Sequence, residues 1–403
     1  MTSGRSITIR LGVGQIIGWG SSFYLPAILA VPISRSLGIE TADFFWAFTL
    51  SLLVSGLLGP QVGRAIDRLG GRAVLPIGSA AFAIGLLLLS VSTNQTMLVG
   101  AWLLIGVGGS MGNYDSAFAT AVSFFGEKSN KVIAGITVFA GFSSTVSWPL
   151  TSYLEQTIGW QQAVFFWALM HLVIGLPLNL SIPKVARKEV PDTTGAIRKV
   201  IKNRFRFDLL LVIFALIFAL EGFIVSSVNT TLPFLLGELG ASSQVALLAA
   251  TILGPSQVLS RVVILLPGTF MTPMRVAAVS IAAHPLGVLL IWAFGVNGLI
   301  PFVILHGIGV GLNPFIRGSL PLLFFGPERF GQRQGYIMML SKLVSALSPT
   351  LLTLLVLTNP QVGIATTFSL GVGAMALLVW LSAIHKVRKR AAVDPSAASS
   401  LEG

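Results

Sequence analysis

Apolar residues along this chain gather in blocks of roughly 20, and short polar stretches separate the blocks. A helix of that length rises about 1.5 Å per residue and can cross the ~30 Å of hydrocarbon in a bilayer. The pattern predicts an all-α membrane protein with twelve membrane-spanning helices, six in each half. The expected spans are residues 10–32, 43–63, 73–92, 96–123, 131–154, 160–182, 208–234, 242–264, 274–294, 298–323, 333–357 and 361–384.

The composition agrees with this pattern. Of the 403 residues, 54% are hydrophobic and only 10% are charged, whereas soluble domains carry about 25% charged residues. The formal charge of +12 does not indicate a nucleic-acid-binding protein, because the cations lie between apolar blocks and not on a polar face. The chain has no Cys, which excludes disulfides and thiolate metal sites. We expect no nucleic-acid partner, no metal and no cofactor.

The positions of Lys and Arg predict how the chain is threaded. Of the 26 cations, 23 fall on one side of the predicted spans, Arg35 falls on the other, and Arg317 and Lys342 fall inside spans. Cytoplasmic loops are enriched in Lys and Arg, so the cation-rich side is expected to be cytoplasmic. Both termini would then be cytoplasmic. The first block lacks a small-residue cleavage site and is expected to be an uncleaved span of a bacterial inner-membrane protein.

One long polar insert divides the chain. Residues 183–207 hold eight of the cations and are predicted to form a cytoplasmic linker, partly as a basic helix against anionic headgroups. The linker separates a first six-helix bundle, residues 1–182, from a second one, residues 208–390. The small and polar residues 391–403 predict a disordered tail.

Similar runs of residues recur in the two halves at offsets near 200. The run Phe-Phe-Gly at 124–126 recurs at 324–326, and Leu-Gly-Pro at 58–60 recurs at 253–255. The glycine-rich run that ends at Asn113 resembles the run that begins at Gly307. Several matches in the same order indicate a duplicated unit. Since both units begin on the same side of the membrane, we expect two pseudo-symmetric bundles related by an axis along the membrane normal.

A charged loop joins the second and third predicted spans. It reads Gly-Arg-Ala-Ile-Asp-Arg-Leu-Gly-Gly-Arg from residue 63 to residue 72, and it resembles the G-x-x-x-D-R-x-G-x-R signature of the major facilitator superfamily. The resemblance implies a transporter in which Asp67 faces the start of the eleventh span, near Arg333, and locks the halves in one conformation. The motif residues are Gly63, Asp67, Arg68, Gly70 and Arg72. Alternatively, the loop is only a positively charged topology signal.

The first half is also similar to a large, poorly characterised bacterial branch of this superfamily. The similarity rests on the region from Asn113 to Asp115, on the Phe-Gly pair at 125–126 and on the run Ser-Thr-Val-Ser-Trp-Pro-Leu-Thr at 144–151. A weaker similarity points to the monocarboxylate and oxalate–formate porters. Those porters carry an Asp–Arg pair in the eighth span, where this chain has only Arg261.

Four ionisable residues, Asp115, Glu221, Arg317 and Lys342, lie deep inside predicted spans, away from the span ends. Such residues are costly in hydrocarbon and mark pathways. We expect Arg317 and Lys342 to form a cationic pocket for an anionic substrate, because Arg binds carboxylates bidentately and Lys adds a point charge. Asp115 would pair with Arg317 in the empty pocket or carry a proton, and Glu221 is a second proton-coupling candidate. Alternatively, these charges form structural ion pairs, or the carboxylates bind a cationic substrate.

Polar and aromatic side chains in the same spans are candidates either for lining the substrate site or for packing between helices. They are Trp19, Tyr24, Asn113, Tyr114, Trp148, Asn229, Asn313 and Tyr336. Three histidines, His171, His284 and His306, lie singly in different spans. Their spacing does not suit a metal site, and each is predicted to be structural.

These features favour a secondary active transporter that alternates access by rocking two bundles about a midplane site. We expect a monomer in the lipid bilayer that moves a small organic solute, an anion in the preferred interpretation, coupled to protons. The sequence lacks the G-x-x-x-x-G-K-[ST] nucleotide loop and the H-E-x-x-H motif of an intramembrane metalloenzyme. Efflux of a toxic or drug-like compound is the alternative. A channel or a non-transporting sensor is a more distant one.

Overall fold

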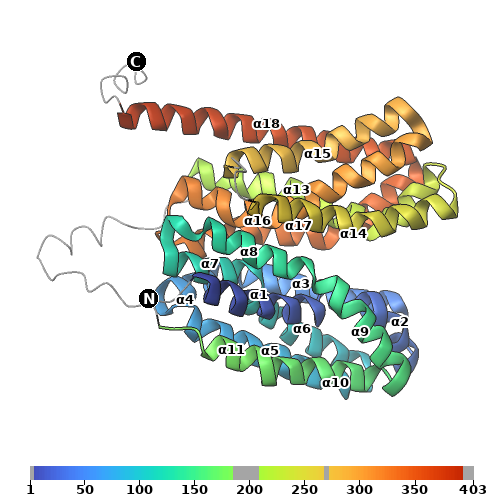
Figure 1. The fold of residues 1–403 in the computed structure, drawn as a ribbon. Helices are drawn as coiled ribbons and strands as arrows, with labels where there is room; N and C mark the ends of the chain where they lie inside the picture. The colour runs from blue at the N-terminus through green and yellow to red at the C-terminus, as the bar shows by residue number, and fades with distance from the viewer. Residues whose placement is uncertain (1–3, 185–207, 267–271, 394–403) are drawn as a thin grey trace, which may run out of the picture.

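The structure, a computed structural model, describes residues 4–184, 208–266 and 272–393. In these ranges every regular element is helical. The helices form two bundles, which lie one above the other in Figure 1. Residues 185–207 of the predicted linker and residues 394–403 of the predicted tail lie outside the described residues.

The first bundle consists of short helices with frequent breaks. They are α1 (Gly4–Gly20), α2 (Pro26–Leu37), α3 (Thr41–Leu57), α4 (Gly59–Leu69), α5 (Gly71–Ser90), α6 (Gln95–Gly112), α7 (Tyr114–Phe125), α8 (Asn130–Gly141), α9 (Ser143–Ile158), α10 (Trp160–Met170) and α11 (Leu176–Leu180). A π-helical turn, His171–Gly175, joins α10 to α11. Most predicted spans of this half are therefore made of two helical pieces.

The second bundle consists of long helices, each of which accounts for one predicted span. They are α13 (Leu209–Glu238), α14 (Ser243–Leu265), α15 (Pro273–Phe294), α16 (Leu299–Phe325), α17 (Phe330–Thr358) and α18 (Pro360–Val393). The last helix runs on to Val393, three residues into the predicted tail, and the boundary between bundle and tail stays a prediction.

The described residues contain eight stretches that are long and apolar enough to cross a membrane. Two of them, Gln95–Ile158 with 64 residues and Pro273–Phe325 with 53, are long enough to cross twice. They reverse direction at Gly126 and Gly295, which both have a φ of 55°, a conformation that favours glycine. The bent pair α3–α4 and the pair α1–α2 provide the remaining crossings. The structure therefore has the twelve spans that the sequence predicts.

The duplicated runs occupy matching places in the two bundles. The Phe-Phe-Gly run ends α7 in the first bundle and α16 in the second, with Gly126 and Gly326 both at positive φ. The Leu-Gly-Pro run differs in its surroundings. A Cβ on Gly59 would lie 3.2 Å from the carbonyl oxygen of Gly335 in the other bundle, whereas a Cβ on Gly254 would meet nothing within 4 Å. The repeat is thus preserved in the chain path and has diverged in its contacts.

The two bundles approach each other most closely where α4 crosses the start of α17. Gly59 and Gly63 on α4 lie against Gly331 and Gly335 on α17. A Cβ on Gly63 would overlap the carbonyl group of Gly331, and a Cβ on Gly335 would overlap that of Gly59. Glycines spaced four residues apart let membrane helices meet backbone to backbone. This contact, which we call the glycine crossing, joins the halves of the chain.

Buried apolar side chains show that the bundles are closed at one end only. At the end where Lys184 and Asp208 lie, here called the linker end, one cluster is shared by both bundles and includes Phe118 and Phe330. Away from the linker end each bundle has a core of its own, one around Trp102 and one around Phe302. Beyond α8, α9 turns away from the second bundle (Figure 1). The bundles therefore diverge from the linker end toward the opposite end.

We predict that Gly63→Ala opens the linker end, because the added Cβ has no space beside Gly331. The cost should be about 1–3 kcal/mol, as for other overpacked contacts. The chain has no native Cys, so spin labels on Leu69→Cys and Lys386→Cys, both exposed, would report the distance across this end. Gly254→Ala is the matched control. A distance distribution unchanged by Gly63→Ala would contradict the prediction.

Candidate functional site

Asp67 lies at the start of α17, as the loop motif implies. Its Oδ1 accepts a hydrogen bond from the Gly331 amide and its Oδ2 one from the Gln332 amide, both at 2.8 Å. The first amides of a helix have no partner within the helix, and a carboxylate there is stabilised by the helix dipole. Arg333 is near enough to act electrostatically on Asp67, but it bonds to the carbonyl groups of Phe325 and Glu328.

The other motif residues differ in what they contact. Gly63 forms the glycine crossing described above. Gly70, with a φ of 80°, makes the turn between α4 and α5, and Arg68 is exposed. Arg72 donates a hydrogen bond to the Ile182 carbonyl at 3.1 Å, inside the first bundle. The link to the second bundle is therefore made by Gly63 and Asp67.

Asp115 and Lys342 form an ion pair across the two bundles. Asp115 lies in the first turn of α7, and its Oδ2 is 2.8 Å from Nζ of Lys342 on α17. Ser55 Oγ accepts a hydrogen bond from Lys342 at 3.3 Å, and Gln334 Nε2 donates one to Asp115 Oδ1 at 3.3 Å. The Asp115 side chain is 16% exposed and the Lys342 side chain is 23% exposed. The ion pair is therefore partly accessible to solvent.

Arg317 on α16 has no such partner. Its Nε is buried without a hydrogen-bond acceptor, and no carboxylate of the described residues lies within ion-pair distance. Asp115 and Glu221 act on it electrostatically from further away. The Asp115–Arg317 pair expected from the sequence is not formed, because α7 packs more extensively against α17 than against α16. Of the predicted cationic pocket, Lys342 is neutralised and Arg317 is not.

The predicted aromatic residues come together on the first bundle. The ring centroids of Trp19 and Tyr114 are 5.1 Å apart, and those of Tyr24 and Trp148 are 5.7 Å apart. Trp148 Nε1 donates a hydrogen bond to the Tyr24 carbonyl at 3.2 Å, and its side chain is 44% exposed. The charge of Arg261 in the second bundle acts on both tyrosines. The aromatic cluster therefore lies on the side of the first bundle that is near the second.

Arg261 itself was not recognised from the sequence as part of this region. It was counted among the loop cations, but it is buried in α14. Its Nε donates to the Gly311 carbonyl at 3.0 Å and its Nη1 to the Thr137 carbonyl of the first bundle at 3.4 Å. Arg261 thus links the bundles at a second place, where α14 packs against α8. Arg261 lies within the predicted span 242–264 and not beyond its end. This position could have indicated that its side chain is buried.

The remaining predicted polar residues are scattered. Asn113 separates α6 from α7, and its buried Oδ1 has no hydrogen-bond partner. Asn313 is buried in the second bundle, where its Nδ2 donates to Glu221 Oε2 at 3.2 Å. Tyr336 is half-buried on α17 and packs against the core shared by both bundles. Of these three, Asn113 is closest in sequence to the Asp115–Lys342 pair.

Two of the histidines are not single residues in the fold. His284 Nδ1 and His306 Nδ1 are 3.0 Å apart, His306 Nε2 is 3.2 Å from Asn229 Oδ1, and His284 Nε2 is 3.5 Å from Glu221 Oε2. The sequence prediction of lone histidines is therefore wrong for this pair. The chain reverses direction at Gly295, which lies midway in sequence between His284 on α15 and His306 on α16. Both histidines are therefore the same number of residues from the turn and lie at the same depth in the bundle.

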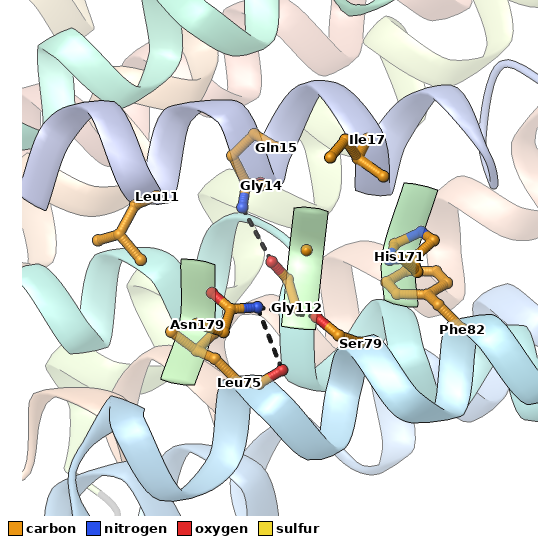
Figure 2. Close-up of a pocket in the computed structure, with 11 residues that line it drawn as sticks. Leu11, Gly14, Gln15, Ile17, Leu75, Ser79, Phe82, Gly112, His171 and Asn179 are labelled. Atoms are coloured by element: carbon orange, nitrogen blue, oxygen red, sulfur yellow. Dashed lines mark hydrogen bonds between the residues drawn. The ribbon is translucent and has the colours of Figure 1, made fainter. Parts of the chain in front are cut away.

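The third histidine, His171, borders a small cavity inside the first bundle (Figure 2). The cavity has a volume of about 10 Å³, close to that of one water probe. Gln15 Nε2 donates to the Gly112 carbonyl at 2.9 Å and Asn179 Nδ2 to Ser79 Oγ at 2.9 Å beside it (Figure 2). This space is too small for an organic solute, and none of the predicted site residues lines it.

Comparison with known proteins gives the family. The family model described as Major Facilitator Superfamily matches residues 11–349, which is most of the chain. The chain belongs to the major facilitator superfamily. This superfamily consists of multi-pass membrane transporters, not enzymes. The prediction from the loop motif and the duplicated halves is confirmed, while the weaker similarity to monocarboxylate and oxalate–formate porters stays a prediction.

The chain resembles curated proteins over part of their length. The probable nitrate/nitrite antiporter NarK1 of Thermus thermophilus is 27% identical over 169 residues, which cover 39% of this chain and 38% of that protein. The uncharacterized MFS-type transporter EfpA of Mycobacterium tuberculosis is 27% identical over 306 residues, 71% of this chain and 54% of that protein. The chain thus spans about a third to a half of these relatives.

A solved superfamily structure shows the same fold at low identity. The proton:xylose symporter XylE superposes with a TM-score of 0.74 at 13% identity, over 94% of this chain and 95% of that chain. At this identity the likeness concerns the fold alone. It supports the arrangement of twelve spans in two bundles.

We predict that Asp115→Asn and Lys342→Gln each destabilise the protein by about 1–3 kcal/mol, the cost of an unpaired charge that loses a charged hydrogen bond. The double variant should recover part of this loss, because neither side chain is then left as an unpaired ion. Thermal unfolding of the purified protein measures all four forms. If the stability loss of the double variant equals the sum of the two single losses, the Asp115–Lys342 pair does not stabilise the closed linker end.

Proposed function

We propose that the chain is a secondary active transporter that moves a small organic anion in step with protons, by rocking its two bundles about the region between Arg317 and the aromatic cluster. The observation that carries this proposal is the buried Nε of Arg317, which has no acceptor. An unpaired guanidinium inside a span is costly. A bound carboxylate would supply both the missing charge and a bidentate acceptor.

The charges around Arg317 favour an anion over a cation. Asp115 is bonded to Lys342, and Oε2 of Glu221 accepts a hydrogen bond from Asn313 inside the second bundle. Arg261, also buried, adds a second positive charge near Tyr24 and Tyr114. A cationic substrate would have to displace Lys342 from Asp115. An anion needs no such displacement, and the nitrate/nitrite antiporter among the relatives is named for anions.

The Asp115–Lys342 pair supports coupling between protonation and conformation. The two charges belong to different bundles, so the pair must break when the linker end opens. Protonation of Asp115 removes its charge and releases Lys342. A proton on Asp115 therefore favours the opposite conformation, which is what coupling requires.

The threading of the chain completes the proposal. The cation-rich loops lie at the linker end, which makes this end cytoplasmic by the positive-inside rule. The protein would be a monomer in a bacterial inner membrane with both termini in the cytoplasm. The conformation described above is then closed to the cytoplasm, and its bundles diverge toward the outside.

We predict that Arg317→Gln abolishes anion transport in proteoliposomes and leaves the protein folded, since Arg317 contributes no ion pair to the fold. Lys342→Gln should reduce transport through its effect on the pair with Asp115. Arg35→Gln, at an exposed position, is the control and should transport normally. A thermal-shift panel of organic acids, sugars, amines and drug-like compounds would select the labelled substrate. Normal flux in Arg317→Gln would contradict the anion site.

We predict that an inward proton gradient drives uptake and that Asp115→Asn and Glu221→Gln each uncouple uptake from the gradient. Each substitution removes a carboxyl group that can bind a proton. Asp43→Asn, in the first turn of α3 far from the linker end, is the control. Flux is followed with and without a protonophore. Uptake that persists unchanged after the gradient collapses would contradict proton coupling.

A further inference from the structure

A continuous polar chain crosses the second bundle. It runs from Asn229 on α13 to His306 on α16, from there to His284 on α15, and then back to Glu221 on α13. The successive separations are 3.2 Å, 3.0 Å and 3.5 Å. Asn313 joins at the far end by donating to Glu221 Oε2. Four side chains from three helices therefore meet in one line inside apolar surroundings.

The chain leads from a half-buried position to a fully buried one. Asn229 is half-buried and precedes the exposed Thr230, whereas Glu221 is 0% exposed and both histidines are at most 2% exposed. Asn229 and Glu221 are eight residues apart on α13, which is about 12 Å along the helix. The half-buried end lies toward the open end of the bundles, opposite the linker end. Groups with this burial are seldom left unsatisfied.

The hydrogen-bond directions determine how many protons the chain holds. Asn229 Oδ1 faces His306 Nε2, so this nitrogen carries a hydrogen and a neutral His306 accepts at Nδ1. His284 must then donate from its Nδ1. A neutral His284 has a bare Nε2 in this arrangement, and it faces Glu221 Oε2. If Glu221 is ionised, His284 Nε2 and Glu221 Oε2 are then two acceptors that face each other. His284 Nε2 has no hydrogen-bond partner, and neither has the other carboxylate oxygen, Glu221 Oε1. One proton on Glu221 joins them.

A second arrangement satisfies the same groups with one proton fewer. If the Asn229 amide turns over, its Nδ2 donates to His306 Nε2. His306 then donates from Nδ1 to His284 Nδ1, and His284 donates from Nε2 to the Glu221 carboxylate. The two arrangements differ by a single proton and by the side of each imidazole that carries hydrogen. Neutral histidines have one donor and one acceptor nitrogen, which makes both arrangements possible.

We propose that this chain is a proton relay that delivers the coupling proton to Glu221. A proton that reaches His306 Nε2 makes an imidazolium, which passes its Nδ1 proton to His284 Nδ1. His284 in turn passes its Nε2 proton to Glu221 Oε2. The net change is one proton gained, from a carboxylate and two neutral imidazoles to a carboxylic acid and two neutral imidazoles. The proposal rests on the proposed transport function and adds the route and final site of the proton.

Arg317 connects this relay to the anion. Glu221 acts electrostatically on Arg317, and a carboxylate at Glu221 partly neutralises the guanidinium. When Glu221 takes up the proton, Arg317 keeps its full charge and attracts an anion more strongly. Proton and anion then bind together, which is the requirement for symport.

The other charged groups on neighbouring helices are engaged elsewhere. Lys342 on α17 is paired with Asp115, and Arg261 on α14 donates to carbonyl groups of Gly311 and Thr137. The part of α17 beside Gly222 presents hydroxyl groups and no charge. Arg317 is therefore the charged group that interacts electrostatically with Glu221. His284 is the titratable side chain that faces Glu221 directly.

Infrared difference spectroscopy of the purified full chain in lipid nanodiscs tests the relay without any substrate. The probe is the proton itself, varied by changing the pH. Raising the pH should remove the carbonyl band of a protonated carboxylic acid and alter imidazole bands in the same titration step. Glu221→Gln should abolish the step in which the carboxyl band and the imidazole bands change together. His171→Asn, which alters a buried histidine of the first bundle that contacts Ser21, should leave both intact.

A second variant tests the route. Asn229→Leu removes the half-buried end of the relay and leaves Glu221 and both histidines in place. It should keep the carboxyl band and slow its appearance after a pH jump by at least tenfold. A step in which the carboxyl and imidazole bands still change together in Glu221→Gln, or an unchanged rate in Asn229→Leu, would overturn the relay. If the infrared titration gives the expected result but substrate flux does not depend on the proton gradient, the relay is supported and the proposed proton coupling of transport is contradicted.

Discussion

Backbone contact between α4 and α17 is the constraint on which the other contacts of α17 with the first bundle depend. No side chain fits between Gly63 and Gly331, so these helices meet at the shortest separation that two helices allow. That separation brings Asp67 within 2.8 Å of the amides at the start of α17. Lys342, about three turns further along the same helix, then reaches Asp115. A transporter that rocks its bundles must break these contacts together, because one rigid helix carries them.

The charges inside and between the bundles divide into groups that hold this conformation and groups that do not. Asp67, Asp115, Lys342 and Arg261 all bond across the two bundles. Arg317 and Glu221 stay within the second bundle, where one lacks a partner at Nε and the other ends a chain of histidines. The first group explains why the linker end is closed, and the second supplies the groups proposed for the anion and the proton. Anion binding at Arg317 and proton binding at Glu221 can therefore act on conformation, because the closed state leaves Arg317 Nε and Glu221 Oε1 without hydrogen-bond partners.

The sequence predicted the spans and the duplication, because apolar block length and recurring runs can be read along the chain, and the resemblance of the loop motif implied the position of Asp67. It did not predict the breaks at Asn113 and at Phe142 between α8 and α9, which depend on how neighbouring helices pack. Asp115 was expected from the sequence to pair with Arg317, yet α7 packs against α17 and Asp115 pairs with Lys342. The His284–His306 contact was missed because each histidine was considered within its own span. Which side chains face each other across helices is decided by helix rotation, and apolar blocks carry little information about it.

The binding of an anion at Arg317 is the central claim of this account. Thermal unfolding of the purified protein, with carboxylate compounds beside neutral and cationic ones of similar size, tests it most directly. A ligand that binds only the folded state stabilises it by RT ln(1 + L/Kd), where L is the free ligand concentration, so the unfolding temperature rises with the logarithm of L once this exceeds the dissociation constant Kd. The account predicts that some carboxylates stabilise the wild type and that none of them stabilises Arg317→Gln. Equal stabilisation of both proteins by a carboxylate, or stabilisation of the wild type by cations alone, would contradict it.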